Sequence, residues 1–292
     1  MKQTRFQIAK KDIVSFFDNY RTNIFKYSSI ADLLEQNRAF WRLPVHLSAG
    51  SFIRLLLDIK LKEHRFQFPH RAVIIYSWGD VPIYNLALSL ADNAYFTHYT
   101  ALYLHNLTDQ VPKTICVNFE QSLKRQSKKI SLAQNRIDFA FSRPQRESKM
   151  IATYGDYNIC LLNGQFTGKA GVVQINTDEG KNLSVTDIER TLIDIAVRPA
   201  YSGGIYEILN AYIRAKDRVS INKLTAILKQ LNFIYPYHQA IGFYLEKAGY
   251  SNDQIKLLKK FDINYNFYLT REIKEKAFSE TWRLYYPQEF GS

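Results

Sequence analysis

Side chains suited to binding a polyanion are concentrated in two blocks of this 292-residue chain. Residues 1–78 hold 13 Lys and Arg against 6 Asp and Glu, which gives a net charge of +7. Residues 122–149 hold 8 against 2, for a net charge of +6, whereas residues 79–121 and 150–292 carry only −3 and +2. Lysines that serve solubility alone are usually spread more evenly. The distribution therefore indicates a surface that faces a polyanion such as nucleic acid.

Polar residues in the first block have the spacing expected of a DNA-recognition helix. Ser48 is a good N-cap, and the helix after it would turn Ser51 and Arg54 outward, away from an apolar face. Serines allow close approach to base edges, and an arginine can bind a phosphate or a guanine. The predicted DNA contacts, including phosphate contacts from the second block, are Arg38, Arg42, His46, Ser48, Ser51, Arg54, Lys62, His70, Arg71, Lys124 and Arg125. A protein-docking module and a merely solvated basic helix are the competing interpretations.

A second polar group lies in a segment that we predict to be helical. Thr186 and Glu189 have the Ser/Thr-x-x-Glu spacing of a capping box, which satisfies free amides at a helix start. Arg190 and Asp194 lie four residues apart, so they share one side of that helix. We interpret Glu189 as a cap and Arg190 with Asp194 as a partly buried ion pair; a polar site is the alternative.

No established catalytic motif is recognisable in the sequence. It lacks a Gly-rich phosphate loop, a Gly-x-Ser-x-Gly elbow, a His-Glu-x-x-His helix and close pairs of metal ligands. We therefore expect no enzymatic activity, no cofactor and no metal. Two alternatives stay open: a ligand-sensing DNA-binding regulator, which needs a concave aromatic pocket, and a metal-dependent nuclease. The nuclease would have to assemble scattered residues, namely Asp138, Asp194, Glu207 and Lys216.

The elements that position the first block have the order of a winged helix-turn-helix. Apolar residues recur at helical spacing in Lys10–Tyr20, again after Ser28, and again after Ser48. Leu61–Phe68 and Ala72–Trp78 are typical of two strands around a turn that contains His70 and Arg71. In this fold the third helix enters the major groove with its first turn nearest the bases.

The remaining chain predicts a helix-rich α/β domain. We expect an α+β protein with a DNA-binding domain over residues 1–94, which includes a connecting helix from Asp80 to Ala94, and a C-terminal domain over residues 95–292. Further helices are predicted at Thr97–Leu107, Val185–Val197, Ile205–Ala215, Ile221–Leu231, His238–Ala248 and Ser251–Lys260. Strands are predicted at Thr114–Phe119, Ile137–Phe141, Met150–Thr153, Ile159–Leu162 and Ala170–Val173. The polar segment Gln121–Ser131 reads as a linker or exposed loop.

Composition places the chain among cytoplasmic globular proteins. An apolar fraction of 46% supports well-formed cores. No run of about 18 apolar residues is present, so we expect no membrane contact. The basic N-terminus lacks the apolar stretch of a signal peptide. Cys116 and Cys160 each lie in an apolar run, which predicts buried, unpaired thiols.

Two central motifs carry a family resemblance. The first combines Tyr95–Ala101 (YFTHYTA), His105–Thr108 (HNLT) and Pro112–Ile115 (PKTI), and the second is Val185–Asp194 (VTDIERTLID). Together and in this order they resemble the AbiEi family, the antitoxins of type IV toxin–antitoxin systems and transcriptional regulators of phage-defence (abortive infection) loci.

The resemblance implies both a fold and a function. It implies a winged-helix first domain that binds inverted repeats in double-stranded DNA at its own promoter. It also implies a second domain, containing Thr186, Glu189, Arg190 and Asp194, that opposes a co-encoded nucleotidyltransferase-like toxin. In that family the antitoxin need not form a stable complex with the toxin. The sequence therefore predicts a DNA-binding repressor that doubles as an antitoxin.

Overall fold

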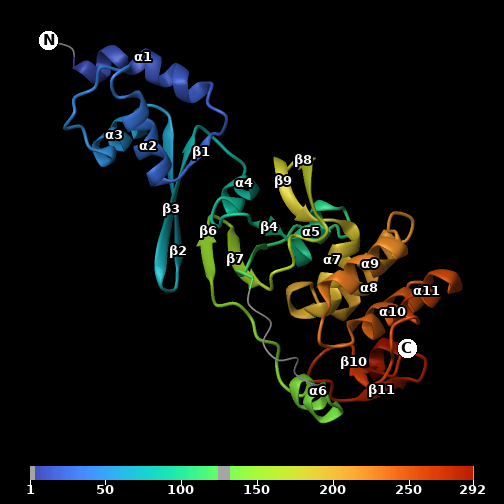
Figure 1. The fold of residues 1–292 in the computed structure, drawn as a ribbon. Coiled ribbons are helices and arrows are strands. Elements are labelled where there is room, and N and C mark those ends of the chain that lie inside the picture. The colour runs from blue at the N-terminus through green and yellow to red at the C-terminus, as the bar shows by residue number, and fades with distance from the viewer. Residues whose placement is uncertain (1–3, 124–131, 292) are drawn as a thin grey trace.

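The computed structural model describes residues 4–123 and 132–291, and the molecule is elongated (Figure 1). A winged-helix unit forms one end, a six-stranded sheet lies in the middle, and a helical region forms the other end. The fold is therefore α+β, with an N-terminal winged helix-turn-helix followed by a helix-rich α/β region, as predicted.

The winged helix is built from helices that each bury one apolar stripe. Trp41 stacks on Phe52 with ring centroids 5.7 Å apart, and Phe17 stacks on Trp78 at 5.0 Å, so aromatic rings fill the shared core. Strand β3 is central, with β1 and β2 on its two sides. The elements are α1 (Arg5–Asp18), β1 (Ile24–Phe25), α2 (Tyr27–Asn37), α3 (Ala49–Leu57), β2 (Leu61–Phe68) and β3 (Arg71–Trp78).

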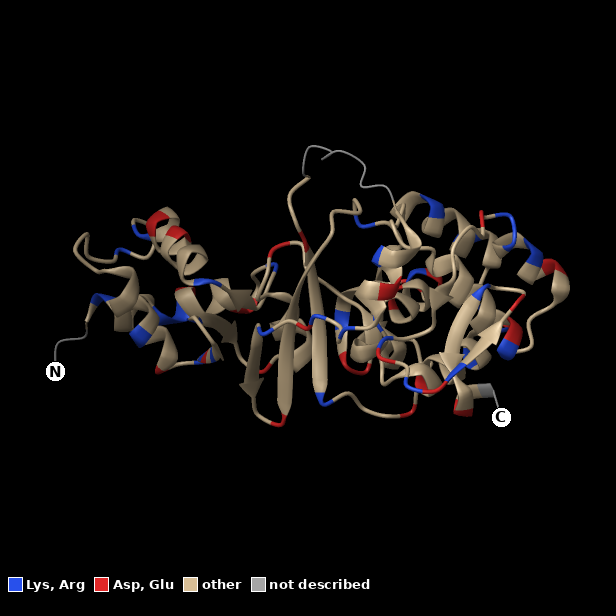
Figure 2. Ribbon diagram, turned by 90° about the horizontal axis from the view of Figure 1, so that it is seen from below, with Lys and Arg blue, Asp and Glu red and all other residues tan. Residues whose placement is uncertain are grey.

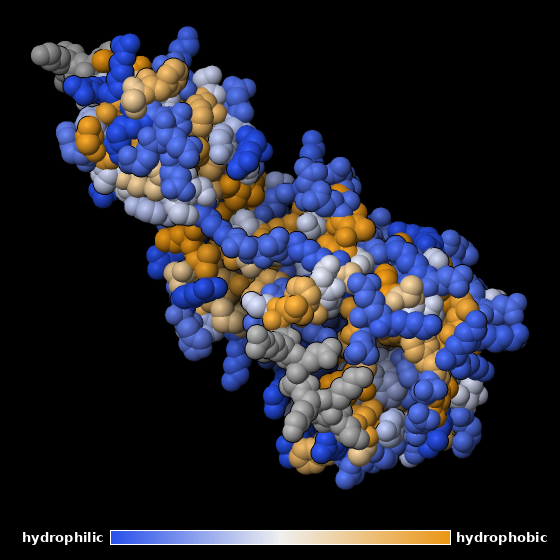
Figure 3. Space-filling model, in the orientation of Figure 1, coloured by the Kyte–Doolittle hydropathy of each residue, from blue (hydrophilic) through white to orange (hydrophobic). Residues whose placement is uncertain are grey.

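The β2–β3 hairpin, which is the wing, packs against the middle sheet instead of projecting freely. Side chains alternate along β2, so Phe66 and Phe68 are buried while Arg65 and Gln67 are exposed. Phe66 stacks on Tyr154 of β6 (Ile151–Tyr154), with ring centroids 4.7 Å apart. Figure 3 shows hydrophobic residues at the junction between the winged helix and the rest of the molecule. The wing therefore joins the two parts.

The middle sheet mixes parallel and antiparallel pairs in the order β6-β7-β5-β4-β9-β8. The parallel pairs are β5 with β7 and β4 with β9. Helix α4 (Ile83–Leu88) packs against β9 and β5, and α5 (His98–Leu104) packs against β5. The strands not yet defined are β4 (Tyr95–Phe96), β5 (Thr114–Glu120), β7 (Tyr157–Gly164), β8 (Val172–Thr177) and β9 (Gly180–Thr186).

The helical region forms the largest hydrophobic core, and the C-terminal segment closes it. Trp282 is fully buried against Gly242, where an added Cβ would lie only 2.2 Å from the indole ring. The helices are α6 (Gln134–Phe141), α7 (Ile188–Val197), α8 (Ile205–Ala215), α9 (Ile221–Leu231), α10 (Tyr237–Lys247) and α11 (Asn252–Leu258). A small sheet and two short 3-10 helices complete it: β10 (Phe267–Tyr268), β11 (Lys276–Ser279), β12 (Leu284–Pro287), η1 (Pro199–Tyr201) and η2 (Gln288–Gly291).

Two of the predicted elements differ from those observed. Ile137–Phe141 was predicted as a strand but lies in helix α6. In a strand Ile137, Phe139 and Phe141 would share one face, whereas in the helix Ile137 and Phe141 are buried together and Phe139 is 59% exposed. The helix predicted from Asp80 to Ala94 extends only over α4, and its chain then turns into β4.

Cys116 and Cys160 are buried free thiols, as predicted. They are register partners in the parallel pair β5–β7, and burial raises the pKa of both thiols, that of Cys160 to about 11. Across residues 4–123 and 132–291, no helix has the length and apolar character needed to span a membrane.

Candidate functional site

Helix α3 has the geometry of a recognition helix. Its N-cap is Ser48, whose hydroxyl accepts a hydrogen bond from the Ser51 amide at 3.2 Å, and the Ser48 hydroxyl also lies 3.0 Å from the Ser51 hydroxyl. The buried side of α3 carries Phe52, Ile53 and Leu56. Ser48 and Arg54 are exposed, so they lie on the face that the sequence analysis assigned to DNA.

Arg38 does not point outward but holds the connection between α2 and α3. Its guanidinium donates hydrogen bonds to the backbone carbonyls of Pro44 at 2.5 Å and Leu47 at 3.0 Å, and it pairs with Glu35. The hydrogen bond that Arg38 donates to the Glu35 carboxylate raises the pKa of Arg38, and only 13% of this side chain is exposed. Arg38 therefore positions the recognition helix and has little surface left for a DNA contact.

The other predicted DNA contacts lie on exposed positions around α3 and the wing. Arg42 and His46 are exposed in the loop before α3, while His70 and Arg71 are exposed at the tip of the wing. Lys62 on β2 forms a salt bridge with Asp80. Lys124 and Arg125 lie outside the described residues.

Arg65 was missed by the sequence analysis although it lies on the exposed face of the wing. The alternation of Phe66 and Phe68 with polar neighbours along β2 indicated its orientation. Within the described part of the chain, no acidic side chain forms a salt bridge with Arg42, Arg54, Arg65 or Arg71. These four arginines are therefore available to phosphate groups.

The predicted ion pair between Arg190 and Asp194 is present and buried. The Arg190 Nε atom donates to the Asp194 carboxylate at 2.7 Å, and both side chains are less than 10% exposed. The Thr97 hydroxyl donates to the second Asp194 oxygen at 2.8 Å, and Arg190 Nη1 donates to the Ala170 carbonyl at 2.7 Å. Burial alone would lower the pKa of Arg190, but Asp194 outweighs it and the pKa is raised. Such a satisfied buried pair fits a structural role.

The predicted capping box at Thr186 is wrong. The N-cap of α7 is Asp187, whose carboxylate accepts from the Arg190 amide at 2.7 Å. Thr186 ends β9, and its hydroxyl lies 2.8 Å from that of Thr191. Glu189 instead accepts from the Ser220 amide at 2.9 Å and so joins α7 to the start of α9. The sequence does have the capping-box spacing, but Thr186 is still the last residue of β9. The helix therefore begins after Asp187.

The two motifs that carry the family resemblance form one structural unit. Phe96 of the first motif is the register partner of Val185 of the second, in parallel strands β4 and β9. His105 Nε2 lies 2.6 Å from the Thr186 carbonyl oxygen, and the hydrogen bond from Thr97 to Asp194 links the start of α5 to the C-terminal half of α7.

His98 is a strained and unpartnered residue inside this unit. Its backbone has φ of 54°, in the left-handed region that a non-glycine residue rarely occupies. The side chain is 7% exposed, and Nδ1 has no hydrogen-bond partner. Burial lowers the pKa of His98 to about 4, so the ring is neutral at pH 7. A buried polar atom without a partner is a place where a ligand can supply one.

The acids of the nuclease alternative have separate surroundings. Asp138 accepts hydrogen bonds from Tyr268 and Gln134, whereas Asp194 is occupied by Arg190 and Thr97. Among the residues described, no group of three His, Cys, Asp or Glu side chains could hold a metal ion.

Comparisons with known proteins support the fold. No protein-family model matches the chain, and no curated protein matches its sequence. Among solved structures, the fold is similar to that of the Rv2827c protein from Mycobacterium tuberculosis, with a TM-score of 0.60 over 96% of this chain and 91% of that chain. The sequence identity is 15%, so this similarity concerns the arrangement of the elements.

Proposed function

We propose that this protein is a DNA-binding transcriptional repressor and antitoxin of the AbiEi type. It would bind inverted repeats at its own promoter through the winged helix and would oppose a co-encoded nucleotidyltransferase-like toxin through its C-terminal region. The observation that carries the proposal is the outer face of α3, where Ser48 and Arg54 are exposed and Ser51 is half-buried. The other exposed arginines of this winged helix form no salt bridge with an acidic side chain of residues 4–123 and 132–291.

Both the shape and the charge of the winged helix suit DNA. A capped helix that is apolar on one side and bears serines and an arginine on the other fits the major groove and can read base edges. Arg42 in the preceding loop and Arg71 at the wing tip flank that helix, where phosphate contacts would orient it. In the ribbon of Figure 2, Lys and Arg positions, coloured blue, occur along the winged helix as well as along the C-terminal region.

The antitoxin part of the proposal rests on the resemblance of the two motifs. Thr97, Asp194 and Arg190 lie in one buried hydrogen-bonded unit. This unit brings together two motifs that are distant in sequence. The unit is buried between the middle sheet and α7. Its role in the antitoxin activity would therefore be to position the surface that acts on the toxin. A stable complex with the toxin is not required by this proposal.

The first test is DNA binding by the full-length protein. Its affinity for the DNA upstream of its own gene should fall steeply between low and moderate salt, because each phosphate contact adds about 0.9 to the log–log salt slope. Fluorescence anisotropy with labelled duplex gives this slope. A slope near zero would contradict the proposal, and magnesium-dependent cleavage of the same duplex would favour a nuclease instead.

The second test separates the two activities in the intact chain. An Arg54→Ala, Arg71→Ala double variant should lose repression of a promoter reporter but still restore growth when it is produced with the neighbouring toxin gene. Lys260→Ala, an exposed charge beyond α11, is the matched control and should retain both activities. Loss of growth rescue by the double variant, at normal protein levels, would show that the antitoxin effect depends on DNA binding.

A further inference from the structure

A concave pocket opens between the end of the middle sheet and the helical region, and no part of the proposed function uses it. Its volume is about 680 Å³, which lies within the usual range of about 300–1,000 Å³ for small-molecule sites. Five separate segments line it: α6 with the chain after it, the residue after β7, the end of α7, the α9–α10 loop with the start of α10, and the loop after β10. We call it the arginine pocket.

The arginine pocket carries an uncompensated positive charge. Arg143, Arg146, Arg198 and Arg271 line it, and no Asp or Glu does. None of the four forms a salt bridge with any residue in the described ranges. Four like charges around one hollow repel each other, so an anion bound among them would stabilise the arrangement.

Two of these arginines are held in place by the protein itself. The Arg143 guanidinium lies over the Phe139 ring, 4.0 Å from its centroid. Arg271 donates hydrogen bonds to the backbone carbonyls of Ala140 and Arg143, the latter at 3.3 Å, and it lies over Phe141 at 4.8 Å. Pre-positioned guanidinium groups lose less freedom when they bind a phosphate, which strengthens recognition.

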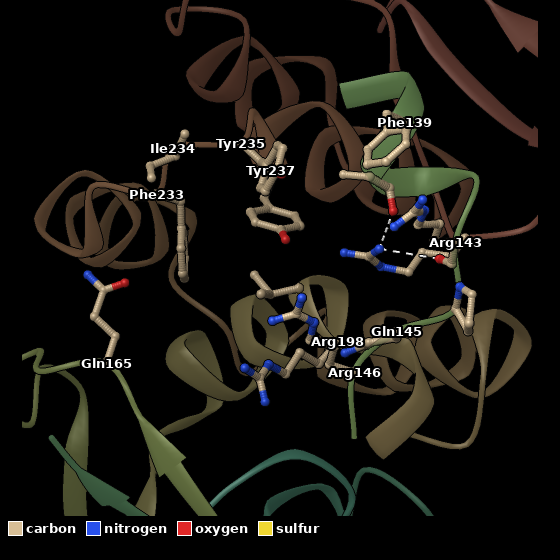
Figure 4. Close-up of a pocket in the computed structure, with 14 residues that line it drawn as sticks. Phe139, Arg143, Gln145, Arg146, Gln165, Arg198, Phe233, Ile234, Tyr235 and Tyr237 are labelled. Carbon is tan, nitrogen blue, oxygen red and sulfur yellow. Dashed lines mark hydrogen bonds between the residues drawn. The ribbon is translucent and has the colours of Figure 1, made fainter. Parts of the chain in front are cut away.

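Aromatic rings form the opposite side of the arginine pocket. Figure 4 shows Phe233, Tyr235 and Tyr237 on one side of the hollow, with Arg146 and Arg198 facing them from the other. Phe233 and Tyr237 are only partly buried, so their rings contact the open space. Exposed rings next to arginines are the surfaces on which nucleobases stack.

A smaller polar cavity of about 140 Å³ adjoins the arginine pocket and shares Gln165, Arg198 and Phe233 with it. His98, with its unpartnered Nδ1, and Asn118 line this inner cavity. Gly164 borders Asn118 so closely that a Cβ there would lie 2.5 Å from the Asn118 amide oxygen. The inner cavity thus offers hydrogen-bonding groups beyond the charged mouth.

We propose that the arginine pocket binds a free nucleoside triphosphate. The four arginines match a ligand with several negative charges, the aromatic wall matches a base, and the inner cavity offers polar groups to the base or sugar edge. The volume fits one such molecule. Because the pocket lies outside the winged helix, the proposal does not depend on DNA binding.

Isothermal titration calorimetry of the full-length protein with ATP, GTP, CTP and UTP tests this proposal. At least one should bind, and Arg146→Gln and Arg198→Gln should each weaken it about ten-fold or more, because charge-assisted hydrogen bonds to phosphate are strong. Arg21→Gln, an exposed arginine of the winged helix, is the matched control and should bind like the wild type. Both pocket arginines are exposed, so these variants should keep the wild-type melting temperature.

Two further probes identify which part of the ligand is recognised. Phe233→Ala should weaken the triphosphate but leave the weaker binding of inorganic tripolyphosphate unchanged, because only the nucleotide has a base to stack. The proposal would be overturned in favour of a simple anion site if tripolyphosphate binds as tightly as ATP and Phe233→Ala has no effect. It would also be overturned if no triphosphate binds, if both glutamine variants bind normally, or if only a short RNA oligonucleotide binds.

Discussion

The arginines of the winged helix and those of the arginine pocket differ in the shape of the surface that carries them. Arg42, Arg54 and Arg71 project from a loop, a helix and a hairpin, respectively, where they can follow an extended chain of phosphates. Arg146 and Arg198 instead converge on one hollow lined by aromatic rings. The same side chain therefore suits a long polyanion in one region and a small, multiply charged ligand in the other.

A third arrangement, the buried pair Arg190–Asp194, completes the comparison, because its charges face each other and not solvent. Removal of an exposed arginine should weaken binding with little effect on stability. Removal of the buried Arg190 should instead lower stability with little effect on binding.

The largest effect is expected from Arg190→Met. This change leaves the Asp194 carboxylate buried without its partner, and breaking such a pair costs about 3–5 kcal/mol of unfolding free energy. Urea denaturation followed by circular dichroism measures it. An Arg190→Met, Asp194→Leu double variant should recover much of the loss. A loss below about 1 kcal/mol, the value of exposed pairs, would remove the distinction between buried and surface arginines.

The next effect is a loss of stability in mild acid, caused by burial of His98 and His238. Burial lowers the pKa of both to about 4, whereas an unfolded histidine has a pKa of about 6.5. As the pH falls from about 6.5 to 4, only the unfolded chain takes up these protons, so stability decreases through that window.

Denaturation at pH 7 and pH 5 measures this loss, which should be on the order of 2 kcal/mol for each histidine. His98→Asn and His238→Asn should each reduce the difference between the two pH values, and asparagine tolerates the positive φ at position 98. His46→Asn, at an exposed position, is the control and should leave the difference unchanged.

The smallest effects should distinguish Arg54 from Arg71 on DNA. Arg54→Ala should weaken binding to the specific site more than to random duplex, because a base contact contributes about 1–3 kcal/mol of discrimination. Arg71→Ala at the wing tip should weaken both about equally and lower the salt slope by about 1. Anisotropy titrations with both duplexes measure this. Identical losses for the two variants would mean that α3 is not the reading helix.

Much of the winged helix could be predicted because its elements are local. The hydrophobic period of 3.6 located α3, and the strand propensity of two stretches around a turn located β2 and β3 almost to the residue. Helices α8 and α9 were predicted with their observed bounds, since Ser220 caps α9 and the apolar stripe of each is regular. The prediction of a strand at Ile137–Phe141 was wrong because three apolar residues at alternate positions are compatible with a strand as well as with a short helix.

The sites were harder to predict because they depend on distant contacts. Arg38 was placed at the correct turn, but its hydrogen bonds to the Pro44 and Leu47 carbonyls follow from the path of the loop. The arginine pocket was not predicted, because its residues come from five segments far apart in sequence, among them Phe139, Arg198 and Arg271. The sequence analysis did note the excess of basic residues in 122–149, which includes the pocket residues Arg143 and Arg146.

The attachment of the wing to β6 affects how the N-terminal region can be studied by itself. Phe66 and Phe68 are covered by the middle sheet, and His64 hydrogen-bonds to Tyr154 at 2.5 Å. A fragment that stops after β3 would expose both phenylalanines to water and leave His64 without that partner. Such a fragment is expected to aggregate or to lose its hairpin, so a failure to bind DNA would reflect a damaged fold. The intact chain is therefore the proper material for measuring what the recognition helix does.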